Sequence, residues 1–481
     1  MNKNDSLIKN SIYNMIYKLL NIIFPLLMSA YVSHIIYSKG VGKVVSAQNI
    51  VQYFLMIAAL GIPEYGIREI AKRRECEKSR NRVFSELFWL NGISTICCIF
   101  AYIVFASYMN WFNDKLLYMI AGISIILNFI NVDWVYQGEE NYKFIMIRSF
   151  IVKITTLILM VILVRTENDY YFYVLANVVA VAGNYIFNII HLRKLGVKLY
   201  FKNLDICRHL KSVFILLCTT ISIELYTLLD ITMLTYSCDE ENVGYYAMAL
   251  KIPKMIIVAV TGISGVLLPR LSRYYSENEI DKCNVIVSNA LAILIFLFIP
   301  CGVGIIIVAP ELMVVLFGES FLPGVATLRI ASLLIYALGF SNLFGTQLLL
   351  TVGKEKQLLL STICGATTNI VLNGILIPKY AQNGAAVASV ISETLVTLMT
   401  LNFAMKNFKI NLEKRGIVVC SVSCVVMTVV CCITKQMFQS SILSLLFTVV
   451  VGGSVYVGCN AIMKNPMLVL LKDIKNKERN Q

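Results

Sequence analysis

The sequence predicts an all-α integral membrane protein with about 14 transmembrane helices, and three observations carry this prediction. Of its 481 residues, 58% are hydrophobic and only 15% are charged, with a mean hydropathy of +0.73. Soluble domains carry roughly 25% charged residues. The apolar residues also form runs that approach or exceed the roughly 20 residues needed to cross a bilayer. Finally, Lys and Arg concentrate in alternate loops.

The predicted spans follow one another along the chain, separated by short polar breaks. They cover residues 11–37, 44–63, 84–108, 116–136, 144–164, 171–190, 212–235, 243–268, 284–309, 325–351, 358–377, 384–405, 416–434 and 440–463. The first run has a basic flank but lacks a small-residue cleavage site, so we expect an uncleaved first span instead of a signal peptide.

The distribution of Lys and Arg orients these spans. With both termini in the cytoplasm, the basic residues of the inner loops outnumber those of the outer loops by about five to one, as the positive-inside rule requires. The net charge of +14 is therefore a topology signal with some attraction to anionic lipid headgroups. No nucleic acid partner is expected.

A weak internal repeat predicts two homologous lobes around a central cavity, a common plan for transporters. The spacing between Gly42 and Arg68 recurs between Gly244 and Arg270. We expect an N-lobe at 1–200 with spans 1–6, a C-lobe at 201–405 with spans 7–12, and a third part at 406–481 with spans 13 and 14 and a cytoplasmic tail. The basic connector at 191–211 is expected to lie on the membrane surface.

Ionisable residues within the spans are the candidate site residues, because a charge at the centre of a spanning helix costs about 3 kcal/mol unless it meets water or a partner. Lys18 lies roughly 13 Å into the membrane along its helix. The predicted ligands of an anionic substrate are Lys18, Lys251, Lys254 and Arg329 within spans, together with Arg68 and Arg270, which are expected to terminate the second and eighth spans on the cytoplasmic side. The predicted counter-charges, or carriers of a coupling ion, are Glu224, Glu393, Asp133 and Asp230.

Simpler interpretations exist for several of these residues. Lys251 could extend to the outer headgroups. Arg329 and Asp230 could anchor the chain at the interface, and Glu224 and Glu393 could pair with a buried lysine. Glu86 is expected to form a helix-end ion pair with Arg82.

Nothing in the sequence predicts an enzyme. The 14 cysteines include no CxxC pair, the three histidines are scattered, and the outer loops are short and lack clustered acids, bases or nucleophiles. We therefore expect no disulfide, no metal and no cofactor.

Five stretches resemble Wzx-type flippases of O-antigen and capsule repeat units, which belong to the multidrug/oligosaccharidyl-lipid/polysaccharide exporter superfamily. They are GIPEYGIREIAKR (61–73), DWVYQGEENYKFIMIRS (133–149), NVGYYAMALKIPK (242–254), LPRLSRYYSE (268–277) and NGILIPKYAQNGAAVASVISE (373–393). The resemblance covers nearly the whole chain in order. One departure is Ala381, where the pattern leads us to expect glycine.

The resemblance implies a 14-helix fold and a substrate of undecaprenyl-diphosphate-linked oligosaccharide, moved from the inner to the outer leaflet of the bacterial cell membrane by alternating access. The cationic cavity residues of the superfamily's lipid flippases match Lys18 and Lys251 here. The implied partners are the lipid-linked substrate, membrane lipids, and the polymerase and glycosyltransferases of the same pathway. Two alternatives share the fold, a peptidoglycan-precursor flippase and a multidrug antiporter; the mid-span lysines argue against the antiporter.

Overall fold

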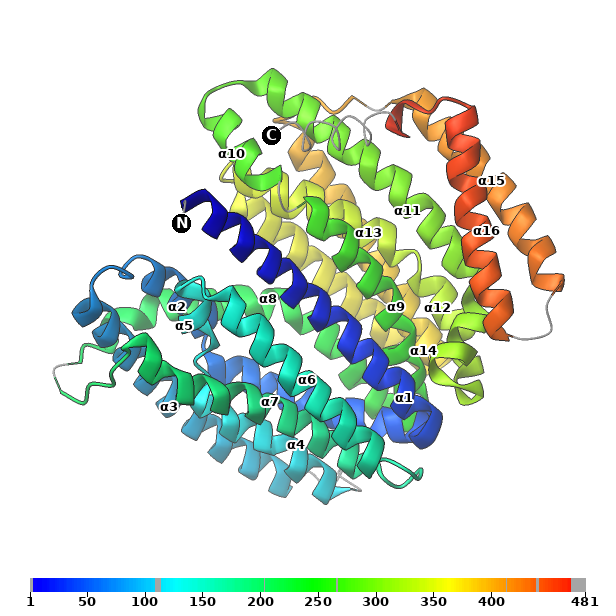
Figure 1. Ribbon diagram of the computed structural model, residues 1–481. Coiled ribbons are helices and arrows are strands. Elements are labelled where there is room, and N and C mark those ends of the chain that lie inside the picture. The colour runs from blue at the N-terminus through cyan, green and yellow to red at the C-terminus, as the bar shows by residue number, and fades with distance from the viewer. Residues whose placement is uncertain are drawn as a thin grey trace. The chain divides into compact units, whose positions relative to one another are not determined.

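The computed structural model describes residues 3–108, 114–202, 204–264, 267–411, 413–437 and 441–468, and every regular element in these ranges is a helix (Figure 1). Helices dominate because a backbone in lipid can satisfy its N–H and C=O groups only within itself. Nine helices in these ranges are long and apolar enough to span a membrane, or up to ten if one broken pair counts as a span. The predicted class of an all-α, multi-pass membrane protein is confirmed. The total of 14 spans and the cytoplasmic placement of both termini stay predictions.

Contacts divide the chain into two compact units, Met1–Thr232 (unit 1) and Met233–Gln481 (unit 2). The division falls inside one helix, α8 (Cys207–Ser237). The expected division into parts at 1–200, 201–405 and 406–481 stays a prediction.

Unit 1 contains the helices that surround the candidate site. In order they are α1 (Lys3–Ala59), α2 (Ile62–Ala71), α3 (Glu77–Tyr108), α4 (Lys115–Leu127), the 3₁₀ turn η1 (Asn128–Ile130), α5 (Asp133–Gly138), α6 (Tyr142–Leu163), α7 (Tyr170–Leu192), the 3₁₀ turn η2 (Arg193–Leu195) and most of α8. Helix α1 packs against α3, α4 and α6, and α7 lies beside α4 and α6 (Figure 1). Short helices α2 and α5 pack together around the buried Trp134.

Unit 2 combines long helices with several short helical pieces. Its elements are α9 (Glu240–Ser264), α10 (Leu267–Ser276), α11 (Ile280–Phe317), η3 (Glu319–Gly324), α12 (Val325–Ala331), α13 (Leu334–Ser341), the π-helical η4 (Asn342–Leu349), α14 (Glu355–Met405), α15 (Lys414–Gln436) and α16 (Ser441–Ile462). The predicted span at 325–351 is therefore three consecutive helical pieces, and the chain bends by 43° between 319–331 and 334–349.

Two of the long helices each contain a sharp turn that separates two predicted spans. In α1 the turn lies at Tyr37 (φ 56°, ψ −176°), and in α14 it lies at Ala381 (φ 46°, ψ −128°). Positive φ is uncommon outside glycine. The turn at Ala381 falls where the family pattern leads us to expect glycine.

In each unit a spanning helix is followed by a ten-residue helix that carries one of the predicted arginines. Arg68 lies in α2, after α1, and Arg270 lies in α10, after α9. Each arginine thus lies on a short helix of its own. That Arg68 terminates the second span and Arg270 the eighth stays a prediction.

Candidate functional site

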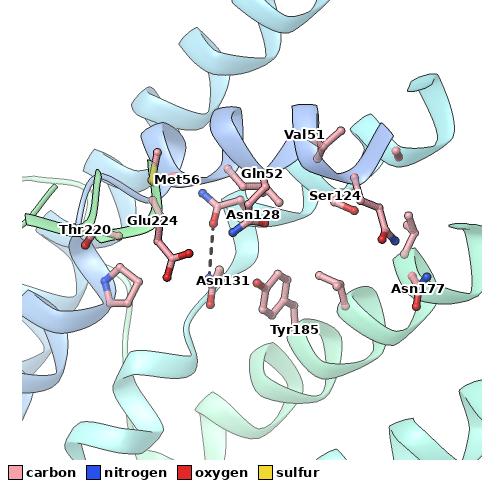
Figure 2. Close-up of a pocket in the computed structure, with 18 of the residues that line it drawn as sticks. Val51, Gln52, Met56, Ser124, Asn128, Asn131, Asn177, Tyr185, Thr220 and Glu224 are labelled. Carbon is pink, nitrogen blue, oxygen red and sulfur yellow. Dashed lines mark hydrogen bonds between the residues drawn. The ribbon is translucent and has the colours of Figure 1, made fainter. Parts of the chain in front are cut away.

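Unit 1 encloses a cavity of about 570 Å³, lined by residues of α1, α2, α4, η1, α7 and α8 (Figure 2). We call it the unit-1 cavity. Its polar lining comprises the carboxamides of Gln48, Gln52, Asn128, Asn131 and Asn177, the hydroxyls of Ser124, Tyr185 and Thr220, and the carboxylates of Glu64 and Glu224. The rest of its lining is apolar apart from a glycine, mainly valines with Leu55 and Met56. Of the predicted site residues whose side chains the structure describes, only Glu224 lines this cavity.

A chain of hydrogen bonds fixes the carboxamides at one end of the unit-1 cavity. The Asn128 amide donates to Asn91 Oδ1 and to Thr95 Oγ1, both at 3.0 Å, and Asn91 in turn donates to the Asn128 carbonyl at 2.6 Å. Asn131 donates to Asn128 Oδ1 at 3.5 Å and accepts from the Asp133 backbone N–H at 3.3 Å. Because its neighbours hold it, Asn131 presents a preorganised polar group.

Helix α8 contributes Thr220 and Glu224, and a glycine lets α8 approach. Gly61 has φ +73°, and a Cβ there would lie 2.7 Å from the Leu217 backbone nitrogen. A larger residue would have to push α8 away. Figure 2 shows Glu224 pointing across the space toward Asn131, with Tyr185 between these residues and Asn177.

Helices α1 and α6 pack together, and each carries a lysine. Lys153, in the middle of α6, donates to Asn21 Oδ1 and has its Nζ 5.9 Å from the centre of the Phe24 ring. Both of these groups are neutral. Lys18 is exposed and precedes Asn21 by one helical turn, on the same face of α1. The sequence interpretation singled out Lys18 and missed Lys153, although Lys153 lies inside the predicted span 144–164.

Asp133 lies in a polar cluster with a buried arginine. Arg148 Nη1 lies 2.8 Å from Asp133 Oδ1, and the side chain of Asn188 bonds both residues. Tyr136 donates to the Asn188 carbonyl at 2.6 Å. The arginine is 4% exposed. In this arrangement Asp133 supplies a counter-charge to Arg148, which neutralises a cation that would be costly to bury alone.

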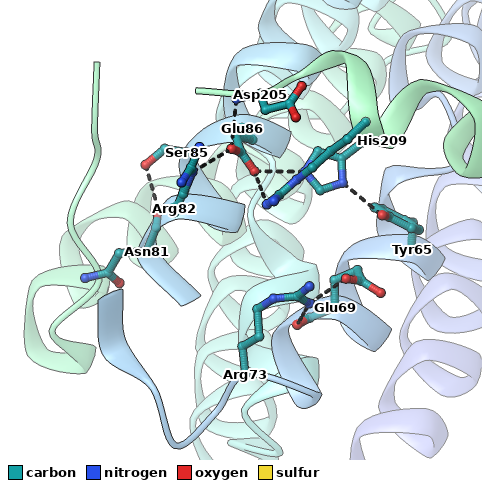
Figure 3. A network of polar contacts seen from close by, with 10 residues as sticks. Tyr65, Glu69, Arg73, Asn81, Arg82, Ser85, Glu86, Asp205 and His209 are labelled. Atoms are coloured by element: carbon teal, nitrogen blue, oxygen red, sulfur yellow. Dashed lines mark hydrogen bonds and ion pairs between the residues drawn. The ribbon is translucent and has the colours of Figure 1, made fainter. Parts of the chain in front are cut away.

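Glu86 is the centre of a second buried cluster, at the ends of α2 and α3 (Figure 3). It is fully buried and contacts Arg82 Nε at 3.1 Å, Arg208 Nη2 at 2.5 Å, His209 Nε2 at 2.9 Å and the Asp205 backbone N–H at 2.9 Å. The expected pair with Arg82 is present, but it is one contact of four.

The same cluster extends to α2. The Tyr65 hydroxyl lies 2.8 Å from His209 Nδ1, and the guanidinium of Arg68 lies 5.4 Å from the centre of the Tyr65 ring. Arg68 itself is exposed, and its Nε is 3.9 Å from Glu69. Glu69 is also paired with Lys72 at 2.9 Å. A further ion pair joins Glu69 to Arg73 at 2.5 Å (Figure 3). Arg68 therefore lies at the exposed edge of a partly neutralised basic cluster.

The connector between α7 and α8 packs against α3. The Tyr200 backbone N–H donates to Ser85 Oγ at 2.7 Å, and Trp89 Nε1 donates to the Tyr200 carbonyl at 3.3 Å. Arg80 donates to the Leu195 carbonyl at 3.0 Å. With Asp205, Arg208 and His209 on Glu86, these bonds fix both ends and the middle of the connector.

The remaining candidates lie on α8, α9, α10, α12 and α14. On α9, Lys251 is half-buried and Lys254 is exposed, on either side of Pro253. Arg329 is exposed and donates to the Ile306 carbonyl at 3.2 Å. Asp230 in unit 1 and Glu393 in unit 2 are buried. Arg270 belongs to α10, but its side chain lies outside the described part of the structure.

Among the described residues, no group of three or more His, Cys, Asp or Glu side chains is placed to hold a metal ion.

The unit-1 cavity is the feature that the sequence analysis missed. Its carboxamides are neutral, so a search for charges within apolar runs passes over them; the one available signal was the pair Asn128 and Asn131 at the end of a predicted span.

Comparison with known proteins identifies relatives along most of the chain. A protein of Escherichia coli K12 named as an O-antigen transporter is 24% identical over 422 residues, which is 85% of this chain and 99% of the relative. A glycan biosynthesis flippase of Haloferax volcanii is 24% identical over 209 residues, covering 42% of this chain and 43% of that protein.

Solved structures show the same fold. The lipid II flippase MurJ in an inward closed conformation matches with a TM-score of 0.75 at 17% identity, covering 96% of this chain and all of that chain. An inward-facing multidrug transporter of the MATE family matches with a TM-score of 0.62 at 15% identity, covering 81% of this chain and 94% of that one.

The family described as "Polysaccharide biosynthesis protein" matches residues 7–275, more than half of the chain. This match and the named relatives confirm the resemblance to Wzx-type flippases, and they assign the chain to transport instead of enzymatic catalysis. The chain belongs to the polysaccharide biosynthesis protein family.

Proposed function

We propose that this protein flips undecaprenyl-diphosphate-linked oligosaccharide repeat units from the cytoplasmic to the outer leaflet of a bacterial plasma membrane, for the synthesis of a surface polysaccharide. Family membership and relatives named for O-antigen transport and glycan flipping support the class of cargo. A diphosphate and a string of sugars cannot cross about 30 Å of hydrocarbon unaided, so the head group needs a polar path while the polyprenyl tail stays in lipid.

The observation that carries the proposal is the pair of lysines on α1 and α6. Lys153 lies in the middle of an apolar helix and contacts a carboxamide and an aromatic ring, neither of which neutralises it. Lys18 shares the same side of α1 as the Asn21 carboxamide. Two ammonium groups at this depth favour an anion, and a flexible lysine can hold a phosphate and release it.

The other predicted cations complete the path in the proposal. The head group enters beside Arg68 and Arg270, which lie on the short helices α2 and α10, and passes to Lys18, Lys153, Lys254 and Lys251 as the protein alternates between inward-open and outward-open states. Arg329 serves the outer end. Glu224, Glu393 and Asp230 act as counter-charges or bind a coupling ion, and Asp133 neutralises Arg148. Polymerase and glycosyltransferases of the pathway are the proposed partners.

The test is translocation in proteoliposomes. A fluorescent undecaprenyl-diphosphate oligosaccharide is reconstituted with the protein, and flipping is read by quenching from outside. We expect Lys18→Ala and Lys153→Ala each to slow flipping by at least about tenfold, the equivalent of losing one charge-assisted contact of about 1.4 kcal/mol. Lys115→Ala, which removes an exposed charge at the start of α4, is the matched control and should transport normally.

A cationic dye serves as the competing cargo. Movement of the dye without movement of the lipid-linked sugar would overturn the proposal in favour of a drug antiporter. Normal flipping by both lysine variants would show that the α1–α6 lysines do not bind the head group.

A further inference from the structure

The chemistry of the unit-1 cavity differs from that of the lysine pair. The described residues that line it include five carboxamides and two carboxylates but no lysine or arginine. A carboxamide offers both a donor and an acceptor, which suits the hydroxyl groups of a sugar. A phosphate would meet Glu64 and Glu224 instead of a cation, so the cavity is unsuited to the diphosphate.

The size of the cavity favours a sugar over a metal ion. Its volume of about 570 Å³ lies in the range of sites for small organic molecules. A bound cation instead needs several oxygen atoms that converge on one point at about 2.0–2.6 Å. The polar groups here are distributed around the space, with Asn177 at the other end from Glu224 and Asn131 (Figure 2).

The cavity is also shaped before any ligand arrives. Asn131 is held by Asn128 and the Asp133 N–H, and Asn128 is held by Asn91 and Thr95. Holding the polar groups in place lowers the entropic cost of binding. Tyr185 adds an aromatic ring to the wall, against which the apolar face of a pyranose can pack.

We propose that the unit-1 cavity receives the glycan part of the transported lipid and selects neutral or amino sugars over acidic ones. The inference rests on the proposed function and adds the class of sugar. A uronic acid would bring a third carboxylate beside Glu64 and Glu224, and like charges repel at short range. Neutral hydroxyls and protonated amino groups suffer no such repulsion.

The first experiment measures binding without transport. The full-length protein in nanodiscs is titrated with cellobiose or with cellobiouronic acid, which differ by one carboxylate, and affinity is read by ligand-observed NMR. We expect cellobiose to bind at least about tenfold more tightly, a difference of about 1.4 kcal/mol. Equal affinities, tighter binding of the acid, or no binding of either sugar would overturn the inference.

Two variants tie the preference to the cavity. Glu224→Gln removes one of the two charges and should bring the ratio of affinities toward one, whereas Asn177→Asp adds a charge and should widen it. Glu167→Gln removes an exposed carboxylate from the loop before α7 and should leave the ratio unchanged. If both cavity variants keep the wild-type ratio, the selection lies elsewhere and the inference fails.

The second experiment separates this inference from the proposed function. Two undecaprenyl-diphosphate oligosaccharides that differ only in one hexose or hexuronate are compared in the flipping assay. Faster flipping of the neutral lipid supports both, whereas equal flipping of both lipids contradicts the inference alone. Selective binding of cellobiose with no flipping of either lipid would overturn the proposed function and leave the cavity preference in place.

Discussion

At the scale of single residues, Ala381 adopts a backbone conformation that glycine adopts far more easily. Its φ of 46° and ψ of −128° let α14 reverse sharply between two spans. Nearby, Gly384 approaches so closely that a Cβ there would lie 2.3 Å from the Leu376 carbonyl oxygen. The turn is therefore tight, and its alanine carries a conformational strain of about 1–3 kcal/mol.

Replacing this alanine should stabilise the protein. In Ala381→Gly the strain is relieved, and the gain is partly offset by the roughly 0.4–1 kcal/mol that glycine costs through the unfolded chain. We expect a net gain of about 1 kcal/mol, seen as a higher Tm in detergent. Ala101→Gly, on an exposed helical position of α3, should lower Tm. An equal decrease in Tm in both variants would show that the turn at Ala381 is not strained.

The charged residues were visible in the sequence, but their partners were not. Asp133 and Glu86 are identifiable because carboxylates are rare in apolar runs. Their partners include Arg148, Asn188, Arg208 and His209, most of them far along the chain, and helical periodicity relates only residues within a few turns. Only the pair of Glu86 with Arg82, four residues apart, could be predicted.

At the scale of elements, the helices were predictable and their breaks were not. Each predicted span falls on helical structure in the described ranges, because a long apolar run in lipid has no alternative to a helix. The break of the 325–351 span into α12, α13 and η4 was not predicted. Its sequence has no proline within these three pieces to mark the bend.

The break at Gly61 leads to a prediction for α8. Gly61→Ala adds a methyl group at φ +73° and within 2.7 Å of the Leu217 nitrogen, so α8 must shift or the turn must open. We expect a loss of about 1–3 kcal/mol, measured as a lower Tm. Gly453→Ala in α16, where no atom lies within 4 Å of the added Cβ, is the control and should cost nothing. A Tm unchanged by the first substitution would contradict the close approach.

The loop before α7 should respond to acid. Asp169 accepts hydrogen bonds from the backbone N–H groups of Arg165 (2.9 Å) and Thr166 (2.7 Å), which lower the pKa of its carboxyl group. Because the folded-state pKa is the lower one, the carboxylate stabilises the loop above the unfolded value of about 3.9 and loses this effect as pH falls through the folded value.

This dependence can be measured by comparing the wild type with Asp169→Asn. We expect the variant to have the lower Tm at pH 7 and the gap to close as the pH falls below about 4. A Tm difference that does not change with pH would show that the charge of Asp169 does not stabilise the loop.

At the scale of the whole molecule, the charge pattern predicts that both termini lie in the cytoplasm. The measurement uses fusions to green fluorescent protein, which fluoresces in the cytoplasm but not after export through the general secretory route. Fusions at either end should both fluoresce, while alkaline phosphatase fusions at the same ends should be inactive. A dark fusion at one end would mean an odd number of spans.

Composition and the alternation of charge between loops suffice to predict that this is a multi-pass membrane protein, because both reflect what a bilayer requires of a chain that crosses it. The unit-1 cavity could not be predicted in the same way. Its lining comes from α1, α2, α4, η1, α7 and α8, and its polar groups are mostly neutral. Nothing in a linear pattern shows which of the many Asn and Gln side chains share a space.

The cluster around Glu86 has a consequence for where Glu224 lies. Asp205, Arg208 and His209 are all bound to one buried carboxylate of α3, so the start of α8 is held in a fixed position. Glu224 follows His209 by about four helical turns, roughly 22 Å along the axis of the same helix. The contacts with Glu86 thus set the rotation and axial position of α8 at its first turn. Because α8 is a continuous helix, they also determine where the Glu224 carboxylate lies in the cavity.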